Sequence, residues 1–275
     1  MTQFLHAECL SNLDTLISKT EESLTKAHKY FLRNGLLLNE AKTQCIFIGT
    51  KQLLSHIPDD IAIHFNDTTI SHSYTVKNLG LHMDRYMVFD KHVDEITRKV
   101  TGILVYINRV SGQFDKSSRV LVVQALVLSV INYCIKIWGT TNNSQKLRVQ
   151  KLQNFAARVA VGGLRKFDHV SPAFEELKWL RIKQKHLFDT LVHVFMTIHG
   201  NYPTWFSSFP CVNQVTRGST RQGDKLFVPR HKTDAGAKSM KIMGPKQWNN
   251  LPSDVTNTIS LKSFKSRLTR YFLST

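Results

Sequence analysis

The sequence predicts an α+β protein that is mainly helical. Apolar residues recur at helical spacing near the N-terminus, through the middle of the chain and at its C-terminus, whereas short extended or alternating segments occur only between residues 45 and 83. Hydrophobic residues make up 42% of the 275 positions, which is enough for a buried core of ordinary composition. The chain is therefore expected to hold one helix, a small set of strands and then a larger helical region.

The first part of the chain combines a helix with short extended segments. Asn34-Gly35 supplies the stop signal of the helix, and Asn66-Asp67 and Asn78-Leu79-Gly80 supply the turns of two antiparallel hairpins. The predicted elements are an amphipathic helix over 10–33, a buried strand over 45–48, and hairpins over 61–70 and 76–83.

Beyond residue 90 the periodicity becomes helical. The segment 116–138 is predicted to be one continuous helix, buried at the centre of this region. Gln124, Asn132 and Lys136 interrupt its apolar run, so a membrane span is not expected. The predicted helices cover 90–110, 116–138, 144–161, 171–198 with internal breaks, and 258–273.

The charge of the chain is strongly uneven. Residues 1–90 hold 8 basic and 10 acidic residues, a net charge of −2, whereas residues 91–275 hold 29 basic and 10 acidic residues, a net charge of +19. A solvated surface without a partner usually mixes both signs, and a field of one sign attracts a polyanion. The distribution therefore predicts nucleic-acid binding through backbone phosphates, without an identifiable base code.

Candidate phosphate contacts lie on one helix and in the region after residue 200. In the predicted helix 144–161, the basic side chains are expected to face outward and the inward face to consist of Leu147, Leu152, Phe155, Ala156 and Val159. The main candidates are Lys146, Arg148, Lys151 and Arg158. The secondary candidates are Arg217, Arg221, Arg230, Lys232, Lys238, Lys241 and Lys246.

Most catalytic classes find no support in the sequence. It has no zinc-ligand spacing, no carboxylate pair in an apolar setting and no glycine-rich phosphate loop after a strand. His186 and His193 share a predicted helix face, where partly buried histidines without a ligand role explain them. The four cysteines form no C-x-x-C pair and the N-terminus lacks the pattern of a signal peptide, so an intracellular location, nuclear or cytoplasmic, is expected.

Five groups of short strings follow one another in a specific order. Each string alone is typical of turns and helix ends in many proteins. The strings are Asn34-Gly35-Leu36-Leu37-Leu38-Asn39-Glu40-Ala41-Lys42-Thr43 with Phe47-Ile48-Gly49; Val76 to Asp84; Tyr133 to Gly139 with Leu147 to Ala160; Leu177 to Ile182; and Gly244 to Pro252 with Ser263-Phe264-Lys265. Taken in order, they resemble the reverse transcriptase of non-LTR (LINE-type) retrotransposons, of the jockey and chicken-repeat kind, over nearly the whole chain.

The resemblance implies three parts and a set of roles. Residues 1–88 would be a palm remnant, 89–200 a helical thumb, and 201–275 a basic C-terminal segment anchored by Trp248 and Leu251. By resemblance, Lys42 would lie near the phosphates of the incoming nucleotide. Leu79 and Gly80 would belong to the hairpin that grips the primer end, where a glycine lets two backbones approach closely. The implied partner is RNA or an RNA/DNA template–primer, and the family uses Mg²⁺.

One departure from the family decides what activity is expected. The family carries a Y/F-A-D-D string upstream of the Asn39-Glu40-Ala41-Lys42-Thr43 string, and its carboxylates hold two divalent ions. No A-D-D string occurs here, because Met1 falls after the point where it belongs. We therefore expect no metal cofactor in this chain and no polymerase activity by it alone. Two alternatives stay open: an inert, partly folded remnant of a degenerate element, and a partial gene model of an active enzyme that lacks its N-terminal polymerase and endonuclease portion.

Overall fold

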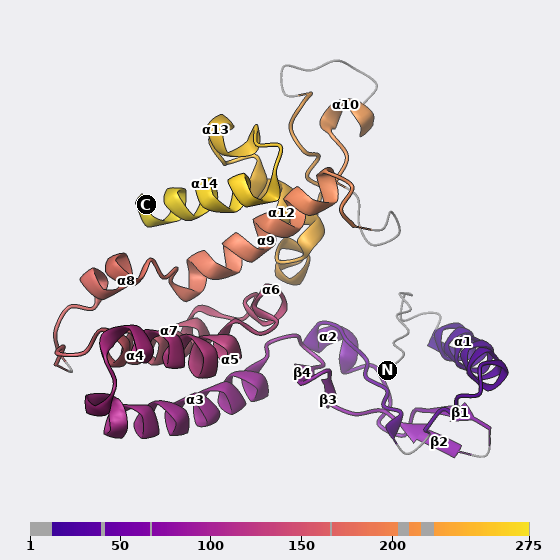
Figure 1. Ribbon diagram of the computed structural model, residues 1–275. Coiled ribbons are helices and arrows are strands. Elements are labelled where there is room, and N and C mark those ends of the chain that lie inside the picture. Colours follow the sequence, from indigo (N-terminus) through magenta and orange to yellow (C-terminus); the bar gives the residue numbers. More distant parts are fainter. Residues whose placement is uncertain are drawn as a thin grey trace. The chain divides into compact units, whose positions relative to one another are not determined.

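The structure consists of two compact units, residues 1–92 and 93–275, which are described separately. The computed structural model describes residues 13–39, 42–66, 68–165, 167–202, 209–215 and 223–274. Helices dominate, and the only strands in the described ranges form two small antiparallel hairpins (Figure 1). The predicted α+β, mainly helical class is confirmed at this level.

The first unit begins with a helix packed on a hairpin. Helix α1 (Leu13–Arg33) packs against β1 (Ala62–Phe65), which pairs antiparallel with β2 (Thr68–Ser71). Leu24, Ile63, Phe65 and Ile70 form the buried cluster between them. The side chain of Glu21 also accepts a hydrogen bond of 2.8 Å from the backbone N–H of His64. The predicted helix is confirmed over residues 13–33, while residues 10–12 lie outside the described part of the chain; the first predicted hairpin is confirmed as well.

A second hairpin follows the first. Strands β3 (Thr75–Asn78) and β4 (Leu81–Asp84) pair antiparallel, as predicted. Their two-residue turn places Leu79 at φ 47° and Gly80 at φ 84°. Two successive residues with positive φ give the turn a twist that matches right-twisted strands, and only the second of them is a glycine. Leu79 is 72% exposed at the tip of the hairpin.

The strand predicted over 45–48 is wrong. Cys45 makes a single isolated parallel bridge with His72, and the backbone N–H of Ser73 donates to the Cys45 carbonyl over 2.8 Å. The apolar run is thus extended but is not part of a sheet. The next described element is the short helix α2 (Lys51–Leu54), capped by the Thr50 hydroxyl.

The second unit contains the remaining helices. Three of the long predicted helices, over 90–110, 144–161 and 258–273, are confirmed, and the region 171–198 breaks once. The described elements are α3 (Asp90–Val110), η3 (Ser111–Gln113), α4 (Lys116–Val123), η4 (Gln124–Leu128), α5 (Ser129–Asn132), α6 (Ile135–Trp138), α7 (Asn143–Val161), α8 (Ser171–Leu177), α9 (Ile182–Ile198), α10 (Val212–Val215), α11 (Asp234–Ala237), α12 (Met240–Trp248), α13 (Ser253–Thr256) and α14 (Leu261–Ser274).

The continuous buried helix predicted over 116–138 is wrong in two respects. A π-helical turn occupies η4, and the helix stops at Tyr133 and Cys134, where Cys134 has a left-handed φ of 52°. One face is also open to solvent, since Leu121 is 67% and Leu126 50% exposed. The break lets the indole of Trp138 turn into the core, where its Nε1 donates to the Tyr133 carbonyl over 2.9 Å.

Helix α7 buries Ala156 and Val159 as predicted, but not Leu147. Leu147 is 60% exposed, whereas Gln153 is buried. The side-chain amide of Gln153 donates to the backbone carbonyl of Leu180 over 2.8 Å, and the side-chain oxygen of Gln150 accepts from the backbone N–H of Ile182 over 2.9 Å. Two glutamine side chains thus form hydrogen bonds with backbone groups just before and at the start of α9. Hydrophobic periodicity cannot reveal this role.

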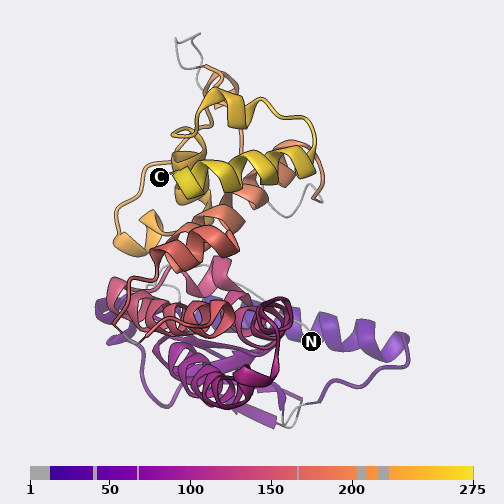
Figure 2. The same cartoon turned by 60° about the vertical axis from the view of Figure 1, so that its left-hand side comes forward.

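Helices α9, α12 and α14 share one core. Phe195 of α9 stacks on Phe264 of α14 with ring centroids 4.4 Å apart, and Trp248 and Leu251 pack against the same cluster. Figures 1 and 2 both show α14 lying alongside α9. The Asn249 amide donates to the Leu226 carbonyl over 2.8 Å and accepts from the Leu226 N–H over 3.0 Å. The string Gly244 to Pro252 therefore has a packing role in this fold.

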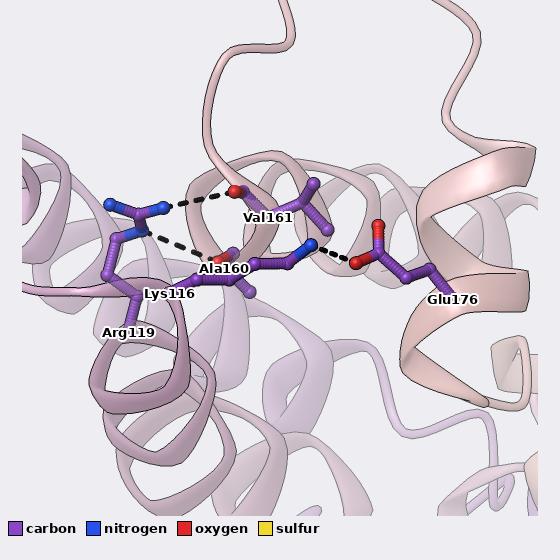
Figure 3. A network of polar contacts seen from close by, with 5 residues as sticks. All are labelled: Lys116, Arg119, Ala160, Val161 and Glu176. Carbon is purple, nitrogen blue, oxygen red and sulfur yellow. Dashed lines mark hydrogen bonds and ion pairs between the residues drawn. The ribbon is translucent and has the colours of Figure 1, made fainter.

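Arg119 of α4 holds the end of α7 (Figure 3). Its guanidinium donates to the carbonyl oxygens of Val161 over 3.1 Å, Ala160 over 3.5 Å and Phe114 over 2.9 Å. A Cβ at Gly162, which has φ 77°, would lie 2.7 Å from an Arg119 nitrogen. The glycine therefore leaves room for the guanidinium, which satisfies carbonyl groups that a helix end leaves without partners.

We expect Arg119→Met to lower the free energy of unfolding of the second unit by about 2–3 kcal/mol, because hydrogen bonds from a charged donor to several carbonyls are lost. The matched control is Lys116→Met on the same helix. Lys116 forms an ion pair with Glu176, but both side chains are nearly half exposed, so its loss should change stability by less than about 1 kcal/mol. Urea titrations followed by tryptophan fluorescence measure both values. Equal effects would contradict the role assigned to Arg119.

Candidate nucleic-acid interface

Helix α7 packs against α9, and each of the two helices carries a lysine near its first turn. Lys146 lies in the first turn of α7, one helical turn before Gln150 and so on the same face. Gln150 binds the first backbone N–H of α9, and Lys183 is the next residue of that helix. Lys146 therefore extends along the side of α7 that meets the beginning of α9.

A third lysine completes the group. Lys238 follows α11, and its charge acts on Lys146 together with the charge of Lys183. We call Lys146, Lys183 and Lys238 the cation cluster. Burial lowers the pKa of Lys146 first, and repulsion by Lys238 and by Lys183 lowers it further.

Two neutral histidines lie in the same part of α9. The rings of His186 and His193 are buried, and the pKa of each is lowered to about 4. Burial is the main cause for both; repulsion by Lys146 adds to it at His186 and repulsion by Lys136 at His193. A backbone hydrogen bond with Lys136 partly opposes the shift at His186. Both rings are therefore uncharged near pH 7.

Gly139 fixes the position of the His186 ring. A Cβ at Gly139 would lie 2.6 Å from a ring carbon of His186 and 2.4 Å from the Ile135 carbonyl oxygen. Only a glycine therefore lets α6 and α9 approach this closely. The Nε2 atom of His186 is buried and has no hydrogen-bond partner within the described ranges.

The other main candidates on α7 are mostly engaged within the protein. Arg148 forms an ion pair of 2.8 Å with Asp94 and also donates to the Gln145 side chain. Arg158 donates to the Asp168 carbonyl over 2.9 Å. Lys151 is exposed. The structure thus groups Lys146 with cations of other helices rather than with the remaining basic residues of α7.

The secondary candidates are spread over the second unit. Of these, Lys238 belongs to the cation cluster. Arg230, Lys232, Lys241 and Lys246 are exposed. Arg217 and Arg221 lie outside the described residues.

The candidates in the first unit are on the surface. Lys42 is exposed, and its backbone N–H donates to the Asn39 side chain over 3.0 Å; Glu40 and Ala41 between them lie outside the described residues. Leu79 and Gly80 form the tip of the β3–β4 hairpin. Both places are open to a ligand.

Sequence reasoning missed Lys183 and His186 as members of this site. Lys183 has no distinctive spacing, and His186 was interpreted as an ordinary partly buried histidine. The packing of α9 against α6 and α7 relates them to Lys146, and spacing along the chain does not reveal it. A second group of cations lies on α14, where Lys262, Arg267 and Arg270 line a shallow hollow of about 410 Å³ with three serines.

Within the described ranges, no three His, Cys, Asp or Glu side chains are grouped so that they could hold a metal ion. No helix in the part of the chain that the structure describes is both long and apolar enough to cross a membrane. No family model matches the chain, and no curated protein or solved structure shows a significant similarity to it.

Proposed function

We propose that residues 93–275 bind nucleic acid through its backbone phosphates, with the cation cluster at the centre of the interface. The observation that carries this proposal is the charge beyond residue 90, where 29 basic residues stand against 10 acidic ones. A field of one sign attracts a polyanion, so nucleic acid is the partner that this excess favours. The charges of Lys183 and Lys238, which help to lower the pKa of half-buried Lys146, support placing part of the interface near these lysines.

We further propose that the chain is part of a non-LTR retrotransposon reverse transcriptase and binds template–primer or element RNA. The ordered strings support this, as does the β3–β4 hairpin, whose tip carries the Leu79-Gly80 pair. On this proposal Lys42, Leu79 and Gly80 contact the nucleotide phosphates and the primer end. Polymerisation needs two Mg²⁺ ions held by carboxylates, and the sequence has no A-D-D string to supply them, so binding is the function proposed for this chain.

The proposal is tested by measuring the affinity for a single-stranded RNA and for an RNA/DNA hybrid between about 50 and 200 mM salt. If about six to ten phosphates are neutralised, affinity should fall by roughly 10³–10⁵ over this range. The triple variant Lys146→Gln, Lys183→Gln and Lys238→Gln should weaken binding, and should reduce the slope of log affinity against log salt by about two.

The matched control removes the same charge elsewhere. Lys262→Gln, Lys265→Gln and Arg270→Gln change three exposed cations of α14 and leave the cation cluster intact. We expect a smaller loss of affinity from this control. Equal losses would contradict the cluster as the centre of the interface, and an affinity that does not respond to salt would contradict nucleic-acid binding and favour an inert remnant.

A further inference from the structure

Aromatic and cationic side chains alternate along one line of contacts in the first unit. Tyr74 directly precedes β3 and Arg85 directly follows β4, so the two residues lie opposite each other at the open end of the hairpin. The guanidinium carbon of Arg85 lies 4.7 Å from the ring centroid of Tyr74 and 5.7 Å from that of Tyr86. The Nζ atom of Lys51 lies 5.8 Å from the Tyr86 ring, and the ring of His72 meets Tyr74 edge-on with centroids 5.7 Å apart. We call these five residues the aromatic–cation ladder.

Hydrogen bonds hold the two central members of the ladder in place. The guanidinium of Arg85 donates to the Leu54 carbonyl at the end of α2 over 3.3 Å, and its backbone N–H donates to the Tyr74 carbonyl over 3.1 Å. The phenol hydroxyl of Tyr74 donates to the Asp59 carboxylate over 3.0 Å. The rings are thus held in position before any ligand arrives, which lowers the entropy cost of binding.

The two tyrosine rings remain open to solvent. Tyr74 is 56% exposed and Tyr86 39% exposed, although both rings contact Arg85. Lys51 is exposed beside them. Exposed aromatic rings next to cations match the chemistry of a nucleotide with an unpaired base, because the base offers a flat face for stacking and the backbone offers a phosphate.

We propose that the aromatic–cation ladder stacks unpaired bases of a single-stranded nucleic acid. Tyr74 and Tyr86 offer the ring faces, Arg85 between them holds the two rings, and Lys51 contacts a flanking phosphate. The inference rests on the nucleic-acid function proposed above and adds base contacts to it. It also adds a preference for single strands, because the bases of a duplex are already stacked on one another.

The test measures the affinity of the full-length protein for a single-stranded RNA of about 12 nucleotides and for an RNA/DNA hybrid of the same length. Tyr74→Leu removes the aromatic face and keeps an apolar side chain. It should lower the affinity for the single strand by roughly 5- to 100-fold and leave the affinity for the hybrid nearly unchanged. The slope of log affinity against log salt should change little, because stacking releases no counterions.

Two control variants separate stacking from other roles of a tyrosine. Tyr74→Phe keeps the ring and loses only the hydrogen bond to Asp59, so it should bind the single strand nearly as well as the wild type. Tyr30→Leu changes a tyrosine of α1 in the same unit that is 64% exposed and lies outside the ladder, and it should leave both affinities unchanged. Hydrogen exchange of the β3–β4 hairpin checks that the first unit stays folded. If Tyr74→Leu unfolds this hairpin, Tyr86→Leu takes its place in the comparison.

The outcomes distinguish this inference from the proposed function. The stacking role is overturned if the folded leucine variant binds the single strand as well as the wild type does, or if single strand and hybrid are weakened equally. Salt-dependent binding by the wild type would still support the nucleic-acid function in both cases. If the wild type binds neither the strand nor the hybrid at any salt concentration, the nucleic-acid function fails and the stacking role fails with it.

Discussion

Trp138→Ala should lower the free energy of unfolding of the second unit by about 3–5 kcal/mol. The indole of Trp138 is fully buried and belongs to the largest side chains of the core. Truncation leaves a cavity, and it also removes the donor of the hydrogen bond to the Tyr133 carbonyl at the helix break. A loss of this size is a large share of the stability of a typical domain, so the variant should unfold at a much lower urea concentration.

The control for this prediction is Trp138→Phe. It keeps an aromatic ring but loses the Nε1 donor, so it should reduce stability by about 1–2 kcal/mol. Tryptophan fluorescence remains usable in both variants, because all four tryptophans of the sequence lie beyond residue 93. A loss below about 1 kcal/mol in Trp138→Ala would show that the core does not depend on the buried indole.

The second unit should lose stability as the pH falls from about 6.5 to about 4. The folded state holds the pKa of His186 and His193 at about 4, below the ordinary value of 6.5. In this window the unfolded chain takes up protons that the folded chain does not, so each step down in pH favours unfolding. His186 alone should account for up to about 3 kcal/mol across the window. His193 is equally buried and has the same lowered pKa, so it should add a further loss in the same window.

Urea titrations in phosphate-free buffers between pH 7 and pH 4.5 measure this effect. His186→Gln should flatten the dependence of stability on pH, because one of the two titrating groups is removed. His169→Gln changes an exposed histidine and should leave the dependence as it is. Asp115, whose pKa is lowered to about 2 by hydrogen bonds from Ser117 and Ser118, acts only below this window. A wild type whose stability does not change between pH 6.5 and 4.5 would refute the assignment.

The sequence alone determined the elements that depend on local chemistry. The helices over 90–110 and 258–273 follow from strict apolar spacing, and the two hairpins follow from turn residues between short alternating runs. The uneven charge also needed no structure, because it is a property of composition. All of these signals act over a few residues. Over that range the local sequence largely fixes the backbone conformation.

Tertiary structure decided the points at which local patterns conflict with packing. The segment 116–138 looked like one helix, but burying Trp138 required a break at Cys134. Leu147 lies outside and Gln153 inside, where the Gln153 side chain donates to the backbone carbonyl of Leu180. These choices depend on residues tens of positions away, which periodicity does not register.

The cation cluster likewise exists only in three dimensions. Lys146 and Lys238 were candidates for general reasons of charge, and Lys183 was not a candidate at all. Their grouping follows from the packing of helices that are distant in the sequence, because electrostatic repulsion depends on distance in space and not on separation along the chain. The sequence thus determined how much positive charge the protein carries, and the fold decided where that charge is concentrated.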